Sequence, residues 1–180
     1  MNEKVGIKFA KVNPNAIIPS KRDEDMGFDI YACFDEDYIV IKPHETKLIP
    51  TGLASAGSSE YGFLLRERGS PGSKGIALMA GVIDSGYRNE WFVGLTNTTE
   101  KTLFISKLSE EETYKSYYDD VIDDIFVDLI STSFVYPYSK AIAQALIIEV
   151  PKTEVEEISY DELKEIQSER GLGKLGSSNK

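Results

Sequence analysis

Residues 80–97 read AGVIDSGYRNEWFVGLTN, and this stretch predicts a strand, a tight turn and a second strand. The first strand holds a β-branched pair, and the Ser-Gly dipeptide at 85–86 is a turn signal. Apolar residues then alternate with other residues along the second strand, at Trp91, Val93 and Leu95. We therefore expect a hairpin with Asp84 at its mouth and Tyr87 just across from it.

The residues at this turn are suited to two different roles. A carboxylate beside an aromatic ring at a rigid turn can orient a water molecule and hold a planar base or a sugar. An Asp at a turn can equally do no more than hydrogen-bond its own backbone. Asp84 and Tyr87 are therefore candidates whose role depends on the remainder of the chain.

Composition limits the classes of function. The chain has 180 residues, 41% of them hydrophobic, so it can bury one sizeable core. Its net charge is −10 and it has no long basic run, which argues against duplex nucleic acid as a partner. Because it has neither a membrane-length apolar run nor a signal-peptide core, we expect a cytoplasmic protein without a membrane partner.

The chain contains one cysteine, Cys33, and one histidine, His44. A single cysteine excludes an intrachain disulfide and makes a zinc cluster improbable. Catalytic triads that depend on histidine have little support. Any general base is therefore expected to be a carboxylate.

Short strands separated by Gly, Pro and Ser recur along the first half of the chain, predicted at residues 5–12, 27–32, 38–41, 47–50 and 61–66. This spacing predicts an all-β barrel or jelly roll rather than a βαβ fold. Asp29 lies inside an apolar strand, and burying a carboxylate requires a partner or a metal.

The loop RERGSPGSKGI at 66–76 follows one of these strands. Its glycines allow backbone N–H groups to approach an anion, and its serines and basic side chains add direct contacts. It lacks the Walker pattern, and as a lone feature it is equally consistent with a flexible surface loop.

Residues 100–140 form the least β-like part of the sequence. Ser109 and Glu112 make a capping box, which predicts the start of an acidic amphipathic helix of about 20 residues. Its acidic face can bind Mg²⁺ or simply be solvated; it contains Asp119, Asp120, Asp123, Asp124 and Asp128.

The end of the chain contains three further features. Residues 141–150 form an apolar run that includes Gln144, and Ser159 with Glu162 caps a short helix through about Gln167. The Gly- and Ser-rich tail after it is consistent with disorder, or with an arm that becomes ordered on an anion.

Five motifs occur in order: GFDIYA at 27–32, RGSPGSKGI at 68–76, AGVIDSGYRNE at 80–90, IAQALI at 142–147 and RGLGKLGSS at 170–178. As an ordered set they resemble the trimeric dUTPase, or dUTP nucleotidohydrolase, family. The long connection before the fourth motif resembles the phage-encoded branch, which carries an insertion there.

The resemblance implies a jelly-roll homotrimer with active sites at the subunit interfaces. Water attacks the α-phosphate of dUTP with Mg²⁺ present, yielding dUMP and pyrophosphate. Asp84 would be the general base, Tyr87 would lie under the deoxyribose, and Asp29 would hold the Mg²⁺ through water. The resemblance also implies contacts to uracil from Met79, Gly81, Val82 and Ile83. It implies contacts to the phosphates from Arg68, Gly69, Ser70 and Gln144. The C-terminal arm would contact the substrate through Arg170, Leu175, Gly176, Ser177 and Ser178.

We expect four segments on this basis: the first part of the barrel at 1–99, a helix-containing insertion at 100–140, the last part of the barrel at 141–168, and a mobile arm at 169–180. Four residues depart from the family pattern. Gly69 replaces a serine, Asn89 a glycine, Ala141 an arginine and Leu175 a phenylalanine.

Two alternatives remain open. One is a regulatory binding protein that contacts a repressor-type partner through the insertion at 100–140, as some insertion-bearing phage dUTPases do. The other is a dCTP deaminase, which shares the fold. Its general-base glutamate corresponds to Gly94 here, so that interpretation lacks its base.

Overall fold

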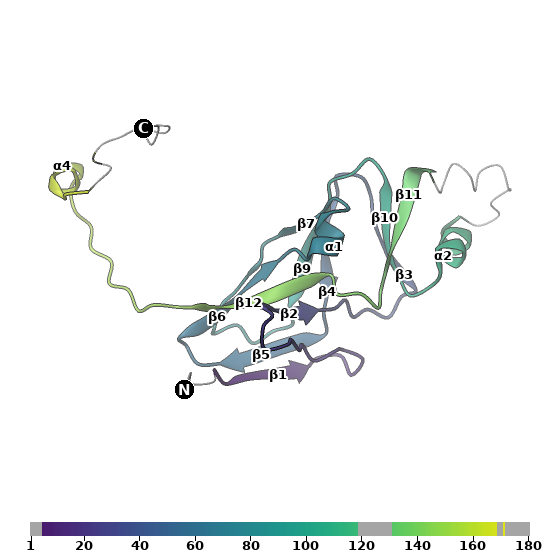
Figure 1. Cartoon of the computed structure of the whole chain (residues 1–180), viewed down its shortest axis with the longest axis horizontal. Helices are drawn as coiled ribbons and strands as arrows, with labels where there is room; N and C mark the ends of the chain where they lie inside the picture. The colour runs from purple at the N-terminus through teal and green to yellow at the C-terminus, as the bar shows by residue number, and fades with distance from the viewer. Residues whose placement is uncertain (1–4, 119–130, 169–170, 172–180) are drawn as a thin grey trace. The chain divides into compact units, whose positions relative to one another are not determined.

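The computed structural model describes residues 5–118, 131–168 and 171. The chain divides into two units, Met1–Val150 and Pro151–Lys180. Twelve strands are described, all in the first unit and arranged in four sheets (Figure 1). The all-β prediction is therefore confirmed for the part of the chain that the structure describes.

One of the four sheets contains the N-terminal strand, and another contains the two strands from the segment 100–140. One is the antiparallel pair β1 (Ile7–Lys11) and β5 (Leu53–Gly57). The other runs in the order β11 (Ser133–Pro137), β10 (Thr102–Ser106) and β3 (Tyr38–Ile41).

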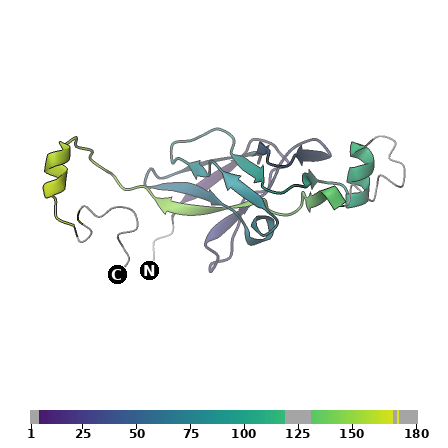
Figure 2. The same ribbon diagram turned by 90° about the horizontal axis from the view of Figure 1, so that it is seen from above.

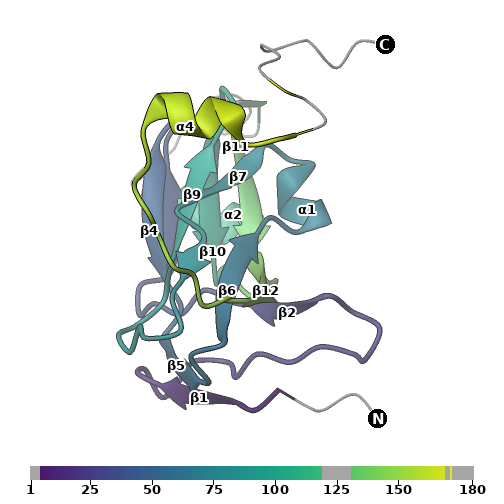
Figure 3. The same cartoon turned by 90° about the vertical axis from the view of Figure 1, so that its left-hand side faces the viewer.

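The other two sheets contain most of the motifs. One runs in the order β2 (Gly27–Ile30), β12 (Ala143–Glu149), β6 (Tyr61–Arg66) and β8 (Val82–Ile83). The other runs in the order β4 (Thr46–Pro50), β9 (Phe92–Asn97) and β7 (Ile76–Met79). A short helix, α1 (Gly69–Gly72), lies beyond the end of β6 (Figure 3).

The predicted hairpin at 80–97 is wrong. β8 pairs with β6, whereas β9 lies between β4 and β7, so the turn carries the chain from one sheet into another. The reason is local: Trp91 donates its backbone N–H to Leu53 O at 2.7 Å and accepts from Thr51 N at 3.2 Å. These bonds hold the start of β9 against the chain at 51–53.

The alternation predicted for this second strand is correct. Trp91, Val93 and Leu95 are all buried in the main core. The Trp91 indole makes edge contacts with Phe63 and Phe9, at centroid distances of 4.8 and 5.6 Å. These aromatic contacts anchor the start of β9 in the core of the first unit.

The segment 100–140 contains more β structure than its sequence predicts. β10 pairs with β3, and β11 runs parallel to β10. Helix α2 (Glu110–Tyr117) begins with the predicted capping box on Ser109 and Glu112. It ends at Tyr117 because Tyr118 leaves the helical region, with φ −114° and ψ 85°. One continuous helix of about 20 residues is therefore wrong, and the aspartates predicted for its acidic face lie outside the described residues.

Helix α2 lies beside the sheet of β11, β10 and β3 (Figure 2), and aromatic residues join the two. Phe104 of β10 makes edge contacts with Tyr114 and Tyr117 at 5.7 and 5.0 Å, and Tyr38 of β3 contacts Phe104 at 5.8 Å. Phe104 and Tyr114 are fully buried. The apolar side of α2 therefore packs on the strands of the first unit.

The second unit contains helix α4 (Tyr160–Glu165), whose N-terminus is the predicted capping box of Ser159 and Glu162. It ends slightly before the predicted Gln167. None of the helices in the described ranges is long and apolar enough to cross a membrane.

Candidate active site

Asp29 has a partner. Its Oδ1 atom lies 3.0 Å from Nε of Arg68, and both side chains are about one-third exposed (33% and 36%). Asp29 comes from β2, whereas Arg68 lies between β6 and α1. The partner that the apolar surroundings of Asp29 require is therefore a basic residue of the second motif.

Gln144 lies beside this ion pair. It sits in β12 between β2 and β6, opposite Asp29 on one side and Arg66 on the other. Its side-chain amide donates to the backbone O of Glu67 at 2.8 Å. Asp29, Arg68 and Gln144 line one polar pocket, so the first, second and fourth motifs meet there.

Two basic residues of this pocket were missed from the sequence. Lys21 and Arg22 line it from the chain that precedes β2. Lys21 Nζ donates to Asp25 O at 2.8 Å, and Arg22 makes a two-bond contact with the Asp25 carboxylate. The available signal is the charged run KRDED at 21–25, immediately before the first motif.

The second motif is more ordered than a loop. Residues 69–72 form the single turn α1, in which Gly72 N and Ser73 N donate to Arg68 O and Gly69 O at 3.0 Å. Gly69 and Ser70 are exposed at its start. The turn brings residues predicted to contact phosphate next to the polar pocket.

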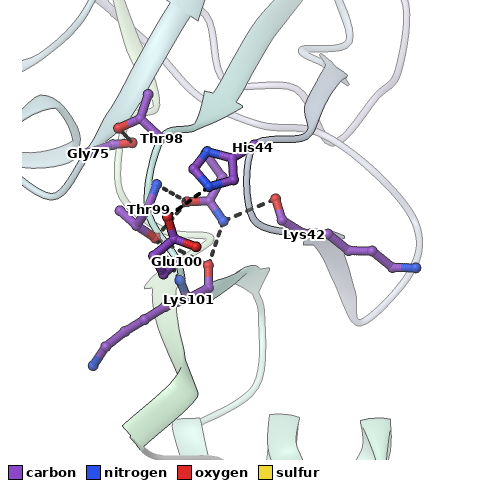
Figure 4. Close-up of polar contacts among 8 residues, drawn as sticks. Lys42, His44, Gly75, Thr98, Thr99, Glu100 and Lys101 are labelled. Carbon is purple, nitrogen blue, oxygen red and sulfur yellow. Dashed lines mark hydrogen bonds and ion pairs between the residues drawn. The ribbon is translucent and has the colours of Figure 1, made fainter.

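The last residues of the second motif are hydrogen-bonded to the chain just after β9. Gly75 O accepts hydrogen bonds from Thr98 N at 2.9 Å and from Thr98 Oγ1 at 2.8 Å (Figure 4). The side-chain amide of Asn97, fully buried, donates to Lys101 O at 2.6 Å and to Lys42 O at 3.2 Å. These residues stabilise the corner that supports the second motif.

His44 occupies the surface of the same corner. Its Nε2 atom lies 3.0 Å from Oε1 of Glu100, and both side chains are largely exposed (Figure 4). It is remote in sequence from all five motifs. Its contacts give no indication of a catalytic role.

Asp84 lies on a closed turn. Tyr87 N donates to Asp84 O at 3.0 Å, and Tyr87 Oη donates to Glu90 O at 3.0 Å. Arg88 Nη1 donates to Ser85 O at 2.6 Å and to Tyr87 O at 3.0 Å. The Asp84 carboxyl group and the Tyr87 ring are exposed on a turn whose backbone is fixed by these bonds.

The backbone before this turn is fixed by close packing on β6. Gly81 O accepts from Leu65 N at 2.6 Å, and a Cβ atom at Gly81 would lie 2.5 Å from Leu65 O. Glycine is therefore required here. The side chains of Met79 and Val82, on either side of Gly81, are exposed, whereas Ile83 is buried.

Within a single chain, Asp84 lies apart from the polar pocket. The residue before Asp84 lies opposite Phe63, near the beginning of β6, whereas Gln144 lies opposite Arg66 at its end. At about 3.3 Å per residue, roughly 13 Å of strand separates Asp84 from the level of Gln144. Asp84 instead lines a separate apolar groove that includes Phe63.

Comparisons with known proteins identify the family. A family model described as dUTPase matches residues 13–109, more than half of the chain. A deoxyuridine 5'-triphosphate nucleotidohydrolase from Nautilia profundicola is 32% identical over 178 residues, which cover 97% of this chain and 99% of that protein. The chain belongs to the dUTPase family. The corresponding protein of Leptospira interrogans is 32% identical over 117 residues, covering 61% of this chain and 80% of that protein.

Solved dUTPase structures have the same fold. The Staphylococcus bacteriophage 80alpha dUTPase with dUPNHPP matches with a TM-score of 0.70 at 21% identity, covering 97% of this chain and 99% of that chain. The native EIAV dUTPase matches with a TM-score of 0.58 at 19% identity, covering 87% and 98%. The predicted jelly-roll-like fold and the resemblance to phage-type dUTPases are confirmed.

The structure gives a physical reason against the deaminase alternative. A Cβ atom at Gly94 would lie 2.8 Å from the backbone O of Met79, so this position has no room for a glutamate without movement of β7. The dUTPase family pattern does not require a glutamate at this position. The backbone at this point therefore fits the dUTPase interpretation.

Two departures from the family pattern fall on described residues near the pocket. Ala141 is buried, and Gly69 is exposed at the start of α1. The predicted arm contacts, Arg170, Leu175, Gly176, Ser177 and Ser178, lie outside the described residues.

The residues of this dUTPase suit a weakly held Mg²⁺. In the described ranges, 5–118, 131–168 and 171, no three His, Cys, Asp or Glu residues gather into a metal cage. Asp29 lies in the polar pocket beside Arg68, and Glu24 and Asp25 also line this pocket. Mg²⁺ that keeps most of its waters and binds substrate phosphates needs no more than such a carboxylate.

Proposed function

We propose that this chain hydrolyses dUTP to dUMP and pyrophosphate, keeping uracil out of DNA and supplying dUMP for dTMP synthesis. The dUTPase family match over residues 13–109 carries this conclusion. The turn that exposes Asp84 and Tyr87, and the polar pocket of Asp29, Arg68 and Gln144, supply side chains of the right chemistry.

Asp84 is proposed as the general base. Its carboxylate takes a proton from the water that attacks the α-phosphorus, and the bond from that phosphorus to the bridging oxygen of pyrophosphate breaks. A carboxylate is suited to this step since the only histidine, His44, lies at the Asn97 corner and pairs with Glu100. The exposed position of Asp84 on a closed turn supports the assignment.

Phosphate binding is proposed for Arg68, Gly69, Ser70 and Gln144. Arg68 supplies positive charge to the leaving pyrophosphate, and α1 offers its first backbone N–H groups. Bound Mg²⁺ would neutralise further charge on the triphosphate, and Asp29 would hold it through a water molecule. The fifth motif, with Arg170, Leu175, Gly176, Ser177 and Ser178, is proposed to close over the substrate.

Specificity is proposed to come from backbone and ring contacts. The backbone of 79–83 would read the uracil edge, since cytosine reverses the donor and acceptor pattern at that edge. The Tyr87 ring, held by its bond to Glu90 O, would lie under the deoxyribose and exclude a 2′-hydroxyl. Met79, Gly81, Val82 and Ile83 contribute through main chain rather than side chain.

A homotrimer with shared sites is the assembly that fits this arrangement. Asp84 and the polar pocket lie toward opposite ends of β6, so a complete site needs Asp84 from one subunit and the pocket from another. The domain divisions at 1–99, 100–140, 141–168 and 169–180 remain part of the proposal, as does a cytoplasmic location.

One assay tests the proposed function. Pyrophosphate release is measured from dUTP, dCTP, dTTP and UTP, with and without Mg²⁺. The proposal requires turnover of dUTP that depends on Mg²⁺, with the other three hydrolysed far more slowly. Equal turnover of dUTP and dTTP, or ammonia release from dCTP, would reject it.

A repressor-type partner on the segment 100–140 is a second proposal. The first turn of α2 is acidic and exposed, with Glu110, Glu111 and Glu112, although these carboxylates already bond Tyr114, Lys115 and Ser109. Three aromatic residues of the same segment, Phe104, Tyr114 and Tyr136, are buried and are therefore not available to a partner. Binding of purified candidate repressors, compared with a chain in which 107–132 is replaced by a short linker, tests this proposal.

A further inference from the structure

The polar pocket contains a second arginine–aspartate pair. Nε and Nη2 of Arg22 lie 3.0 Å from Oδ2 and Oδ1 of Asp25, so the two side chains meet through two parallel hydrogen bonds. Both residues line the pocket that Asp29 and Arg68 also line. The pocket therefore holds two guanidinium groups, and a carboxylate fixes each of them.

The turn that carries Arg22 is closed by four further hydrogen bonds. Asp25 N donates to Arg22 O at 3.1 Å, and Arg22 N donates to Asp25 Oδ2 at 3.2 Å. Nζ of Lys21 donates to Asp25 O at 2.8 Å and to Arg22 O at 3.2 Å. The Arg22 guanidinium is therefore held in place although its side chain is 87% exposed, which reduces the entropy lost when it binds a ligand.

The base of this loop is fixed to the first motif. Asp29 N donates to Ser20 O at 3.3 Å, so the chain enters the loop beside the carboxylate proposed to hold Mg²⁺. At the other end of the loop, a Cβ atom at Gly27 would lie 2.9 Å from Oε1 of Gln144. A side chain there would displace the Gln144 amide, which lines the same pocket. The loop 20–26 is therefore a fixed rim beside the residues proposed to bind phosphate.

The Arg22 guanidinium has donors left for a ligand. A guanidinium carries five N–H groups, and within the described residues the Arg22 side chain donates to Asp25 alone. The pocket has a volume of about 630 Å³. Complete small-molecule sites usually measure about 300–1,000 Å³. The pocket therefore has room for several phosphate groups, and a second guanidinium at its rim suits their charge.

We propose that Arg22 binds the β- and γ-phosphates of dUTP, the two distal phosphates, and so makes the site select triphosphates. The inference rests on the proposed dUTP hydrolysis and adds to it a residue outside the five motifs. The α-phosphate must reach the water held by Asp84, and Asp84 lies apart from the polar pocket. The pocket therefore receives the end of the substrate that is farthest from the nucleoside.

Three ligands separate distal-phosphate binding from a general effect of charge. The non-hydrolysable imido analogue of dUTP carries all three phosphates. Pyrophosphate, the product, carries only the distal pair, and dUMP carries only the phosphate nearest the nucleoside. Loss of the Arg22 guanidinium should therefore weaken the first two ligands and spare the third.

The test compares Arg22→Gln with Lys11→Gln, a matched loss of one exposed positive charge. Lys11 ends β1, donates its Nζ to Pro14 O at 3.3 Å and does not line the polar pocket. We expect Arg22→Gln to raise the Kd of the imido analogue, the KM for dUTP and the inhibition constant of pyrophosphate by about 5- to 20-fold. The Kd of dUMP should change less than about twofold, and Lys11→Gln should change none of these values beyond that limit.

A third variant separates ligand binding from support of the turn. Asp25→Asn breaks the same ion pair but keeps the guanidinium, so it should weaken the imido analogue less than Arg22→Gln does, by no more than about threefold. An equal loss in the two variants would mean that Arg22 only holds the turn, and the inference would fail. It would also be overturned by an equal loss of dUMP binding, by unchanged inhibition by pyrophosphate, or by the same effect from Lys11→Gln.

Failure of the inference is distinguishable from failure of the proposed function. The unsubstituted chain and Lys11→Gln are assayed first for dUTP turnover. Absence of turnover in both rejects the proposed function. Normal turnover in both, with an unaffected Arg22→Gln variant, rejects only the role of Arg22.

Discussion

Nε of Arg68 lies 3.0 Å from Oδ1 of Asp29, so the second motif and the first motif are joined by an ion pair across the edge of the β2–β12–β6 sheet. Both side chains remain about one-third exposed, so each can still contact water or a ligand. A guanidinium already paired in this way has a fixed position. It can therefore bind phosphate without losing further side-chain entropy.

Replacement of Asp29 by Asn should weaken both the position of Arg68 and the retention of Mg²⁺. We expect the Mg²⁺ concentration for half-maximal activity to rise by roughly 10-fold, because a water-mediated contact to a charged group is lost. The measurement is a Mg²⁺ titration of dUTP turnover. Asp161→Asn is the control, since it breaks an ion pair with Lys164 on α4 and should leave the titration curve unchanged.

Replacement of Asp84 by Asn should abolish hydrolysis while leaving the fold intact. An amide cannot accept the proton of water, and loss of a general base costs about 10²–10⁴-fold in kcat. Steady-state turnover is compared with binding of the imido analogue, which should remain close to that of the unsubstituted chain. A variant that keeps more than about one-tenth of kcat would show that Asp84 is not the base.

Removal of the chain from Arg170 onward should reduce kcat sharply and leave the melting temperature unchanged. An arm that closes on the substrate adds contacts in the transition state and little to the resting fold. Turnover and thermal melting are measured on the truncated and full chains. Equal turnover in the two would mean that the fifth motif takes no part in catalysis.

Glu67 should contribute to stability above its ordinary pKa and lose that contribution in acid. Its pKa lies below the usual 4.5, because backbone N–H groups of Glu67 itself and of Leu78 bond the carboxylate and Arg66 lies beside it. The folded state therefore keeps the charge longer than the unfolded chain, and stability falls as the pH drops below 4.5 toward the lower folded-state pKa.

The measurement for Glu67 is the melting temperature between about pH 3 and pH 7. Glu67→Gln should melt lower at pH 7 and show a shallower decline in acid than the unsubstituted chain. Glu149→Gln, at the exposed end of β12, is the control and should run parallel to the unsubstituted chain. A decline for Glu67→Gln that matches the control would contradict the prediction.

The sequence predicts which residues at 91–95 are buried, but not which strands pair with one another. The alternation of Trp91, Val93 and Leu95 predicted burial correctly because period-2 patterns report which face is buried. The same pattern does not say which strand is the neighbour, and β8 and β9 pair in different sheets. Pairing partners are set by contacts far apart in sequence, such as that between Trp91 and Leu53.

Other misses have similar causes. β5 was not predicted because its sequence, LASAG, is short and made mainly of small residues. The polar pocket includes Lys21 and Arg22, whose run of charges predicts only a solvated loop. The burial of Tyr136 follows from the parallel pairing of β10 and β11, which no local pattern signals.

The separation of Asp84 from the polar pocket along β6 predicts complementation between mutant subunits. When each site draws its base from one subunit and its pocket from another, two inactive proteins can repair one another. A chain with Asp84→Asn still offers an intact pocket, and a chain whose pocket is disabled, for example by Asp29→Asn together with Arg68→Ala, still offers an intact base. Refolded together in equal amounts, such chains would regain about one-quarter of the sites, because each half is intact half of the time. Two alleles that are each defective alone would then complement in the same cell.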